Sequence, residues 1–305
     1  MNRVTSIVCV VCCVSLMGCA SQDNDVQERN VSTGAKKNIV TSFYPLAFIT
    51  KMIVGDHADV INLAGSQEVH DYVLSPEDLK MLYNADLVIY MGSDLESWAG
   101  DVIPQLERNN IKILNITQNM TLFASGEDAH EHETFDPHVW TNPVYAQEIV
   151  KKIMMAVTEI DSTNTEVYNI NGQMAINQFH AIDQEYVEGL KNCMRRQAIV
   201  SHEAFGYIAR QYDLELHAIV GISTMDEPSS QLLAELKEVA QKEGITHVLA
   251  ERNSVQRFAQ TVAQTTGLDM LIIYSLEQES SDVQKTYYAM MRDNLHQLRV
   301  ALACE

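Results

Sequence analysis

Basic residues are scarce in this chain. Its 305 residues include 21 Lys and Arg against 41 Asp and Glu, which gives a formal net charge of −20 at pH 7. Phosphate binding needs clustered Lys and Arg, so this balance excludes nucleic acid as an expected partner. An acidic surface attracts cations instead, although only as a general tendency.

Apolar runs of membrane-spanning length are also missing. The run "IVCVVCCVSLMG" follows Arg3, the only charge before it, and is shorter than a comfortable transmembrane helix. Its layout is typical of a secretory signal. The run ends in Leu16-Met17-Gly18-Cys19, which resembles the lipobox of bacterial lipoproteins. That resemblance implies cleavage before Cys19 and a diacylglycerol on this cysteine, and an ordinary signal peptide is the alternative.

Few cysteines are left for the folded part. Three of the six lie in the signal and Cys19 would carry the lipid, so only Cys193 and Cys304 remain. Outside the cytosol such a pair could form a disulfide. The sequence cannot show that their Cα atoms are close enough, so two unpaired buried cysteines are the other possibility.

Strands alternate with helices in two stretches of the chain, and this alternation predicts parallel sheets covered by helices on both faces. The predicted strands are 38–43, 58–65, 86–92 and 111–117, then 197–205, 214–222, 246–252 and 268–274. The predicted helices beside them are 45–55, 75–85, 96–110, 206–213, 229–244, 254–267 and 285–303.

A strand-poor stretch separates the two halves. It predicts one helix over 142–161 and a second, long one over 162–191, with Ser162 or Thr163 as its N-cap. A helix of about 28 residues is roughly 42 Å long, which suits a strut between two lobes.

The expected organisation is therefore an α/β chain of two lobes, each with a parallel sheet flanked by helices, joined by a long rigid linking helix. The boundaries are a signal peptide at 1–18, a flexible tether at 19–37, an N-terminal lobe at 38–160, the linking helix at 161–192 and a C-terminal lobe at 193–305.

Three of the ten histidines follow predicted strands. His70, His138 and His202 occupy loop positions at strand ends and are spread over both halves. The carboxyl ends of parallel strands in two α/β lobes border the cleft between them, where a ligand is expected. Each histidine taken singly is more often a hydrogen-bonded or surface residue. Together they are candidates for a metal site that bridges two lobes.

Seven stretches of the chain, in order, resemble the metal-binding lipoproteins of ABC transporters for zinc and manganese, which are also described as bacterial adhesins. The stretches are "TSFYPLAFITKMIVGD" (41–56), "VHDYVLSPEDLKML" (69–82), "ADLVIYMGSDLESW" (85–98), "FDPHVWTNP" (135–143), "SHEAFGYIARQY" (201–212), "GISTMDEPSSQLLAEL" (221–236) and "YSLEQ" (274–278). The resemblance covers nearly all of residues 38–303.

The resemblance implies a metal between two lobes, with His70, His138 and His202 as ligands. Tyr274 matches the position of an aspartate ligand in manganese-binding relatives, and Glu277 matches a fourth ligand of some zinc-binding relatives, with water as the alternative. Imidazole suits Zn²⁺, whereas Mn²⁺ prefers oxygen ligands. We therefore expect Zn²⁺, with Mn²⁺ as the alternative.

The acidic loop before His138 contains two more histidines, His130 and His132. It resembles a short version of the His-rich loop of zinc-binding relatives, which implies accessory capture of metal. A solvated charged loop is the alternative.

The expected function is capture of Zn²⁺ and its delivery to a membrane permease of an ABC transporter. The protein is expected to be extracytoplasmic, anchored to the bacterial membrane by lipid, monomeric and not an enzyme. The alternatives are a manganese- or iron-binding member of the family, a surface adhesin, and a zinc hydrolase in which Glu203 acts as a base. Because bound imidazole must be neutral, binding is expected to weaken as the pH falls through about 6.5.

Overall fold

The computed structural model describes residues 36–124, 135–221, 228–251, 255–280, 282 and 285–305. The expected signal peptide, the lipidation site Cys19 and the loop histidines His130 and His132 lie outside these residues. Within the described part, no helix combines the length and the apolar composition needed to cross a membrane.

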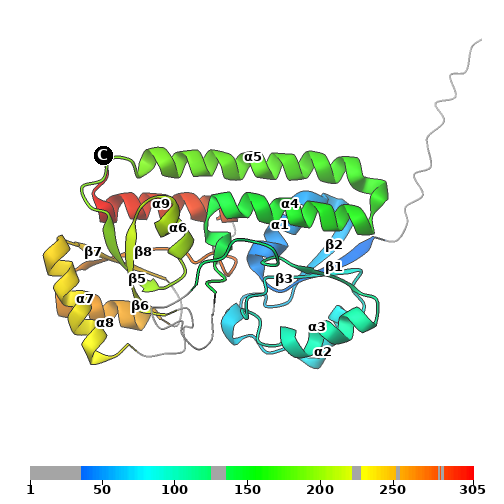
Figure 1. Cartoon of the computed structure of the whole chain (residues 1–305), viewed down its shortest axis with the longest axis horizontal. Coiled ribbons are helices and arrows are strands. Elements are labelled where there is room, and N and C mark those ends of the chain that lie inside the picture. Colours follow the sequence, from blue (N-terminus) through cyan, green and yellow to red (C-terminus); the bar gives the residue numbers. More distant parts are fainter. Residues whose placement is uncertain (1–35, 125–134, 222–227, 252–254, 281, 283–284) are drawn as a thin grey trace, which may run out of the picture. The chain divides into compact units, whose positions relative to one another are not determined.

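The N-terminal lobe contains a four-stranded parallel sheet with the strand order β2-β1-β3-β4. Helices α1 and α4 cover one face of this sheet, and α2 and α3 lie on the other (Figure 1). The strands are β1 (Lys37–Thr41), β2 (Ala58–Asn62), β3 (Leu87–Tyr90) and β4 (Lys112–Asn115). The helices are α1 (Tyr44–Val54), α2 (Pro76–Tyr83), α3 (Ala99–Arg108) and α4 (Pro143–Ile160).

Two helix starts in this lobe are set by local sequence. The Ser75 hydroxyl accepts the backbone N–H of Asp78, and the Asp78 carboxylate accepts the backbone N–H of Ser75, so α2 begins with a complete capping box. The predicted Ser75 cap is therefore confirmed. At α4, the Asn142 side chain accepts the backbone N–H groups of Val144 and Tyr145. This cap fixes where the chain turns from the loop containing His138 into α4.

The C-terminal lobe repeats the same connectivity, with the strand order β6-β5-β7-β8 and parallel pairing throughout. The alternation predicted from the sequence is confirmed in both lobes. The strands are β5 (Gln197–His202), β6 (Glu215–Val220), β7 (His247–Ala250) and β8 (Asp269–Ile272). The helices are α6 (Gly206–Gln211), α7 (Ser230–Glu243), α8 (Gln256–Thr266) and α9 (Tyr287–Leu302).

One long helix, α5 (Thr165–Gly189), links the lobes. It packs on α1 and α4 of the N-terminal lobe and on α9 of the C-terminal lobe (Figure 1). A Cβ at position 172 would lie 2.5 Å from Met154 Sδ, so Gly172 lets α5 approach α4 closely. The predicted N-cap was wrong: Ser162 and Thr163 belong to a preceding 3₁₀ turn, and Asn164 takes the cap position without a side-chain cap.

A single apolar core runs through both lobes. It includes Val88 of β3, Phe179 of α5, Tyr287 of α9 and Val200 of β5, each at most 1% exposed. The opposite face of the C-terminal sheet has a separate core under α7 and α8. Full burial of such a side chain contributes roughly 1.5–3 kcal/mol. The shared core therefore stabilises the arrangement of the two sheets as well as each lobe.

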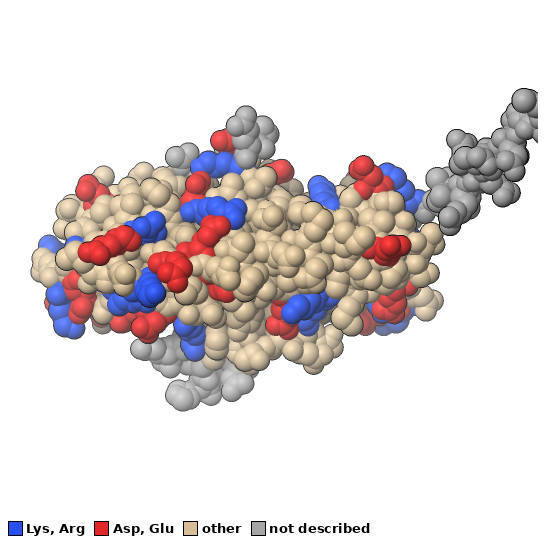
Figure 2. Space-filling view, turned by 90° about the horizontal axis from the view of Figure 1, so that it is seen from above, with Lys and Arg blue, Asp and Glu red and all other residues tan. Residues whose placement is uncertain are grey.

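Charged side chains are mixed in sign on the face that carries α5. Figure 2 shows acidic and basic groups interspersed there, beside a wide stretch that holds neither. One bidentate ion pair links two helices of this region: Arg292 Nε of α9 lies 2.8 Å from Glu185 Oε2 of α5. The large net negative charge of the chain is thus not gathered into one patch on this face.

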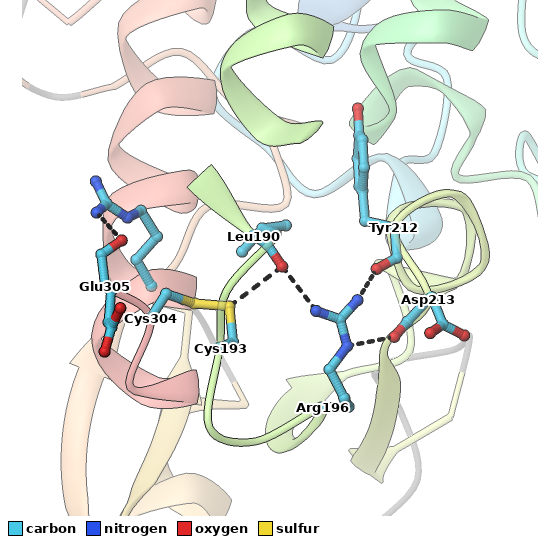
Figure 3. Close-up of a disulfide and its surroundings, with 8 residues drawn as sticks. Leu190, Cys193, Arg196, Tyr212, Asp213, Cys304 and Glu305 are labelled. Atoms are coloured by element: carbon cyan, nitrogen blue, oxygen red, sulfur yellow. Dashed lines mark hydrogen bonds between the residues drawn. A yellow bond between two sulfur atoms is a disulfide. The ribbon is translucent and has the colours of Figure 1, made fainter. Parts of the chain in front are cut away.

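A disulfide joins Cys193, which follows α5, to Cys304, which follows α9 (Figure 3). Arg196 reinforces the same region by donating to the carbonyl oxygens of Leu190 at 2.7 Å and Asp213 at 2.8 Å. The disulfide holds the segment after α9 against the segment after the linking helix, and Arg196 ties that second segment to the turn between α6 and β6.

Candidate metal centre

One of the three candidate histidines ends a strand of the C-terminal sheet, and the other two lie in connections that follow strands of the N-terminal sheet. His70 lies in a 3₁₀ turn, Val69–Asp71, on the connection that leaves β2. His138 directly precedes a second 3₁₀ turn, Val139–Thr141, which leads into α4. His202 is the last residue of β5. Parallel strands bring their carboxyl ends to one edge of a sheet, which is why residues so distant in sequence meet.

These histidines form a cluster of metal-ligating dimensions. One ring nitrogen from each of the three lies within 4.8 Å of the other two. His70 Nε2 and His138 Nε2 are 3.3 Å apart. A tetrahedral Zn²⁺ with Zn–N bonds of about 2.0–2.1 Å would separate two ligand atoms by roughly 3.3–3.4 Å. The pair formed by His70 and His138 already has this spacing.

Burial disfavours the charged form of two of the three histidines, His70 and His138. His138 and His202 are fully buried, and the side chain of His70 is 9% exposed. Burial, together with the nearby charges of His138 and His202, lowers the pKa of His70 to about 3. Burial also lowers the pKa of His138, although Asp136 opposes this effect. Neutral imidazoles present the lone pairs that a metal needs.

Two buried carboxylates lie beside the rings of two candidate ligands. Asp136 Oδ1 lies 2.8 Å from His138 Nδ1, and Glu251 Oε1 lies 3.3 Å from His202 Nδ1. A carboxylate that holds Nδ1–H leaves Nε2 of the same ring free to bind metal. Burial raises the pKa of Glu251, but the charge of His202 and hydrogen bonds from His202 and Ser275 bring it below its usual value.

A third buried carboxylate, that of Glu277, borders the cluster directly. Its Oε1 atom lies 3.8 Å from His70 Nε2 and 3.9 Å from His138 Nε2. Within the described residues this atom has no hydrogen-bond partner. Burial, with the negative charges of Glu251 and Glu68, raises the pKa of Glu277 to about 8. A cation beside Glu277 would favour its charged form.

Tyr274, three residues before Glu277, is engaged elsewhere. Its backbone N–H and C=O both bond to the Asn294 side chain of α9, at 2.8 and 2.7 Å. Its hydroxyl lies 3.1 Å from Lys285 Nζ. Glu277, rather than Tyr274, is therefore the candidate oxygen ligand after β8.

Hydrogen bonds between the lobes surround the site. Trp140 Nε1 donates to Ser275 O at 2.8 Å, and Asn142 Nδ2 donates to Tyr207 O at 2.8 Å. Trp140 is fully buried and its ring centroid lies 4.9 Å from that of His138. This tryptophan packs against a candidate ligand, and its hydrogen bond to Ser275 links the two lobes.

Sequence reasoning missed the roles of Asp136 and Glu251. Both had a detectable signal. Asp136 stands two residues before a candidate ligand, and Glu251 directly follows β7, at the same edge of the sheet as His202. The pairing of each carboxylate with one particular histidine needs the three-dimensional structure.

Comparisons with known proteins agree with this arrangement. Residues 39–301 match the family model described as zinc-uptake complex component A, periplasmic. The zinc-binding lipoprotein AdcA of Streptococcus pneumoniae is 30% identical over 313 residues, which cover 98% of this chain and 61% of AdcA. The chain thus spans about three fifths of the length of that relative. The high-affinity zinc uptake system protein ZnuA of Bacillus subtilis is 31% identical, and the match covers 89% of both chains.

Solved structures show the same fold. The crystal structure of a Zn(II)-bound mutant variant of AdcAII from Streptococcus pneumoniae superposes with a TM-score of 0.80 at 30% identity, covering 88% of this chain and 98% of that one. One conclusion follows from the fold, from the meeting of the three histidines and from the match of residues 39–301 to the family model. This chain belongs to the family of periplasmic zinc-uptake components, described as zinc-uptake complex component A.

Proposed function

We propose that this protein is the extracytoplasmic zinc-binding component of an ABC transporter, which captures Zn²⁺ between its lobes and delivers it to a membrane permease. The observation that carries this proposal is the cluster of three histidines, contributed by two lobes, whose ligand atoms all lie within 4.8 Å of one another. Family membership and the names of relatives such as AdcA and ZnuA support zinc as the cargo.

His70, His138 and His202 are the proposed nitrogen ligands, and Glu277 is the proposed oxygen ligand. Three imidazoles and one carboxylate form a normal tetrahedral zinc set, whereas Mn²⁺ prefers more oxygen ligands. Asp136 and Glu251 hold the rings of His138 and His202 in the orientation that exposes Nε2. In this arrangement the metal ties the two lobes together.

Metal capture should cause a modest local rearrangement rather than a wide swing of the lobes. The continuous apolar core and the hydrogen bonds from Trp140 and Asn142 already join the lobes beside the site. Glu277 Oε1 must approach the His70 and His138 nitrogens by only about half an ångström to complete a tetrahedron.

A zinc titration of His202→Ala tests the proposal. Loss of the one proposed imidazole ligand from the C-terminal lobe should collapse zinc affinity and abolish the rise in thermal stability on zinc addition, which is about 4 kcal/mol when free metal is 1,000 times Kd. His180→Ala, an exposed histidine of α5, is the matched control and should bind zinc normally. Unchanged affinity in His202→Ala would mean that the metal does not bridge the lobes.

Glu277→Gln should cost less than loss of a histidine if water can take the fourth position. Competition between Zn²⁺ and Mn²⁺, measured on this variant and on the unmodified protein, separates the two cargo hypotheses, since removal of an oxygen ligand weakens the binding of Mn²⁺ more than that of Zn²⁺.

We do not propose an enzymatic role. Hydrolysis assays on the zinc-loaded protein would reveal the hydrolase alternative.

The membrane anchor and the capture loop belong to this proposal but lie outside the described residues. Lipid on Cys19 would keep the protein at the membrane, as expected of a monomeric partner of a permease, and Cys19→Ala should release it without changing zinc affinity. His130 and His132 would speed metal acquisition. If His130→Ala/His132→Ala lowered equilibrium affinity as much as His138→Ala, these two residues would be ligands instead.

A further inference from the structure

A pocket of about 630 Å³ opens beside the metal centre. One side of it comes from the N-terminal lobe at Ser66, on the loop after β2. The rest comes from the C-terminal lobe, through Glu251 after β7, the segment that follows β8, and Met290 of α9. The pocket therefore lies between the lobes, at the edge where the strands end.

Glu277 and Glu251 line the side of the pocket nearest the histidine cluster, which we call its inner wall. Glu277 is 5% exposed and its Oε1 atom has no hydrogen-bond partner within the described residues, yet it lines the pocket. The same oxygen lies 3.8 Å from His70 Nε2 and 3.9 Å from His138 Nε2. Glu277 thus contacts the pocket on one side and borders the histidine cluster on the other.

The outer part of the pocket is acidic. Glu279 and Asp282 line it and are exposed to solvent. Lys285 is the only basic side chain among the described lining residues, and its Nζ lies 2.5 Å from Asp293 Oδ2, which offsets its charge. A cation that approaches this pocket meets carboxylates at the surface and another at the inner wall. Clefts lined by one sign of charge raise the association rate of oppositely charged ligands.

We propose that Zn²⁺ enters and leaves the histidine cluster through this pocket, with Glu279 and Asp282 attracting the cation at the surface and Glu277 receiving it at the inner wall. The inference rests on the proposed zinc-binding function and adds a route and its guiding residues to it. Because Ser66 of one lobe and residues of the other line the route, its width changes with small movements between the lobes.

The first test is the association rate of Zn²⁺ with the full-length protein, measured by stopped-flow mixing with a chromophoric zinc indicator. Glu279→Gln/Asp282→Asn should lower the rate constant about three- to tenfold at low salt, and the difference should shrink at high salt because exposed charges are screened. Asp101→Asn/Glu107→Gln is the control: it removes two exposed carboxylates from α3, away from the pocket. Equal rates for the two double variants would overturn the guiding role.

The second test obstructs the route without touching a ligand. Ser66→Phe adds bulk at the pocket wall and should slow association and dissociation by the same factor, leaving the equilibrium Kd unchanged. Ser162→Phe, at an exposed position before α5, is the matched control and should change neither rate. Zinc binding with unaltered rates in Ser66→Phe would overturn the route and leave the proposed function standing. Failure of the unmodified protein to bind Zn²⁺ would overturn both.

Discussion

Asp136 Oδ1 lies 2.8 Å from Nδ1 of His138 and also accepts the backbone N–H of the same residue at 2.9 Å. One carboxylate oxygen therefore fixes both the ring and the backbone of a candidate ligand. The other oxygen, Oδ2, faces the opposite lobe, where a Cβ at position 206 would lie 2.7 Å away. Asp136 is thus packed between the candidate ligand His138 and the first turn of α6 in the other lobe.

Asp136→Asn should weaken zinc binding about 10- to 100-fold, the usual effect of removing a carboxylate that supports a histidine ligand. The amide keeps the size of the side chain but loses the charge that holds Nδ1–H. Competition titration against a chelator of known affinity measures the change. Asp101→Asn, an exposed change on α3, is the control. Unaltered affinity in Asp136→Asn would limit Asp136 to a role in loop structure.

Gly206→Ala should also lower zinc affinity, although it contacts no metal ligand. The added methyl group would displace the Asp136 carboxylate, and with it the His138 ring. Gly100→Ala on α3, where a Cβ meets nothing within 4 Å, is the matched control and should bind zinc normally. Combining Gly206→Ala with Asp136→Asn gives a sharper test: the two effects should not add, because both act through one carboxylate.

Most of the fold was predictable from the sequence because its patterns are local. The alternation of apolar strands with amphipathic helices identified each of the strands β1 to β8 found in the described residues, and Ser75 identified the start of α2. The start of α5 was not predictable. Ser162 and Thr163 are good capping residues, but in the structure they form a 3₁₀ turn that precedes the helix. Capping residues indicate that a helix begins nearby, and tertiary packing determines the residue at which it begins.

The candidate ligands were found from the sequence through their place at strand ends and a family resemblance, but their environment was not. Pairing of Glu251 with His202 and of Asp136 with His138 depends on which side chains face each other after the lobes assemble. The pocket behind Glu277 likewise combines residues from positions 66 to 290. Such long-range relationships leave no periodic signal in a single sequence.

The pH dependence of zinc binding should be governed by Glu277 rather than by His70 or His138, since burial lowers the pKa of both imidazoles. The pKa of His70 is lowered to about 3, so its imidazole stays neutral throughout the range in which an exposed histidine becomes protonated. This differs from the expectation that histidine protonation weakens binding near pH 6.5. The pKa of Glu277 is raised to about 8, so below that pH Glu277 must release a proton when Zn²⁺ binds.

Zinc affinity should therefore fall as the pH is lowered from 8, by about tenfold per pH unit for one displaced proton. Calorimetry in buffers of different ionisation enthalpy should detect close to one proton released per Zn²⁺ at pH 6.5. Glu277→Gln has no such proton, so its affinity should be nearly constant between pH 8 and 6. A slope as steep in Glu277→Gln as in the unmodified protein would assign the proton to another group.

Removal of the disulfide should lower stability without lowering zinc affinity. The cross-link between Cys193 and Cys304 closes a loop with a sequence separation of 111, for which chain entropy gives at most about 5 kcal/mol, and typical losses are about 2–4 kcal/mol. The bond joins the segment after α5 to the end of α9, and neither cysteine is among the residues around the histidine cluster.

Denaturant unfolding of Cys193→Ser/Cys304→Ser should show this loss of stability. Reduction of the unmodified protein should reproduce it, because both treatments remove the same constraint. Zinc titration of the folded variant should give the affinity of the unmodified protein; a large drop in affinity would mean that the cross-link holds the C-terminal lobe in its zinc-binding arrangement.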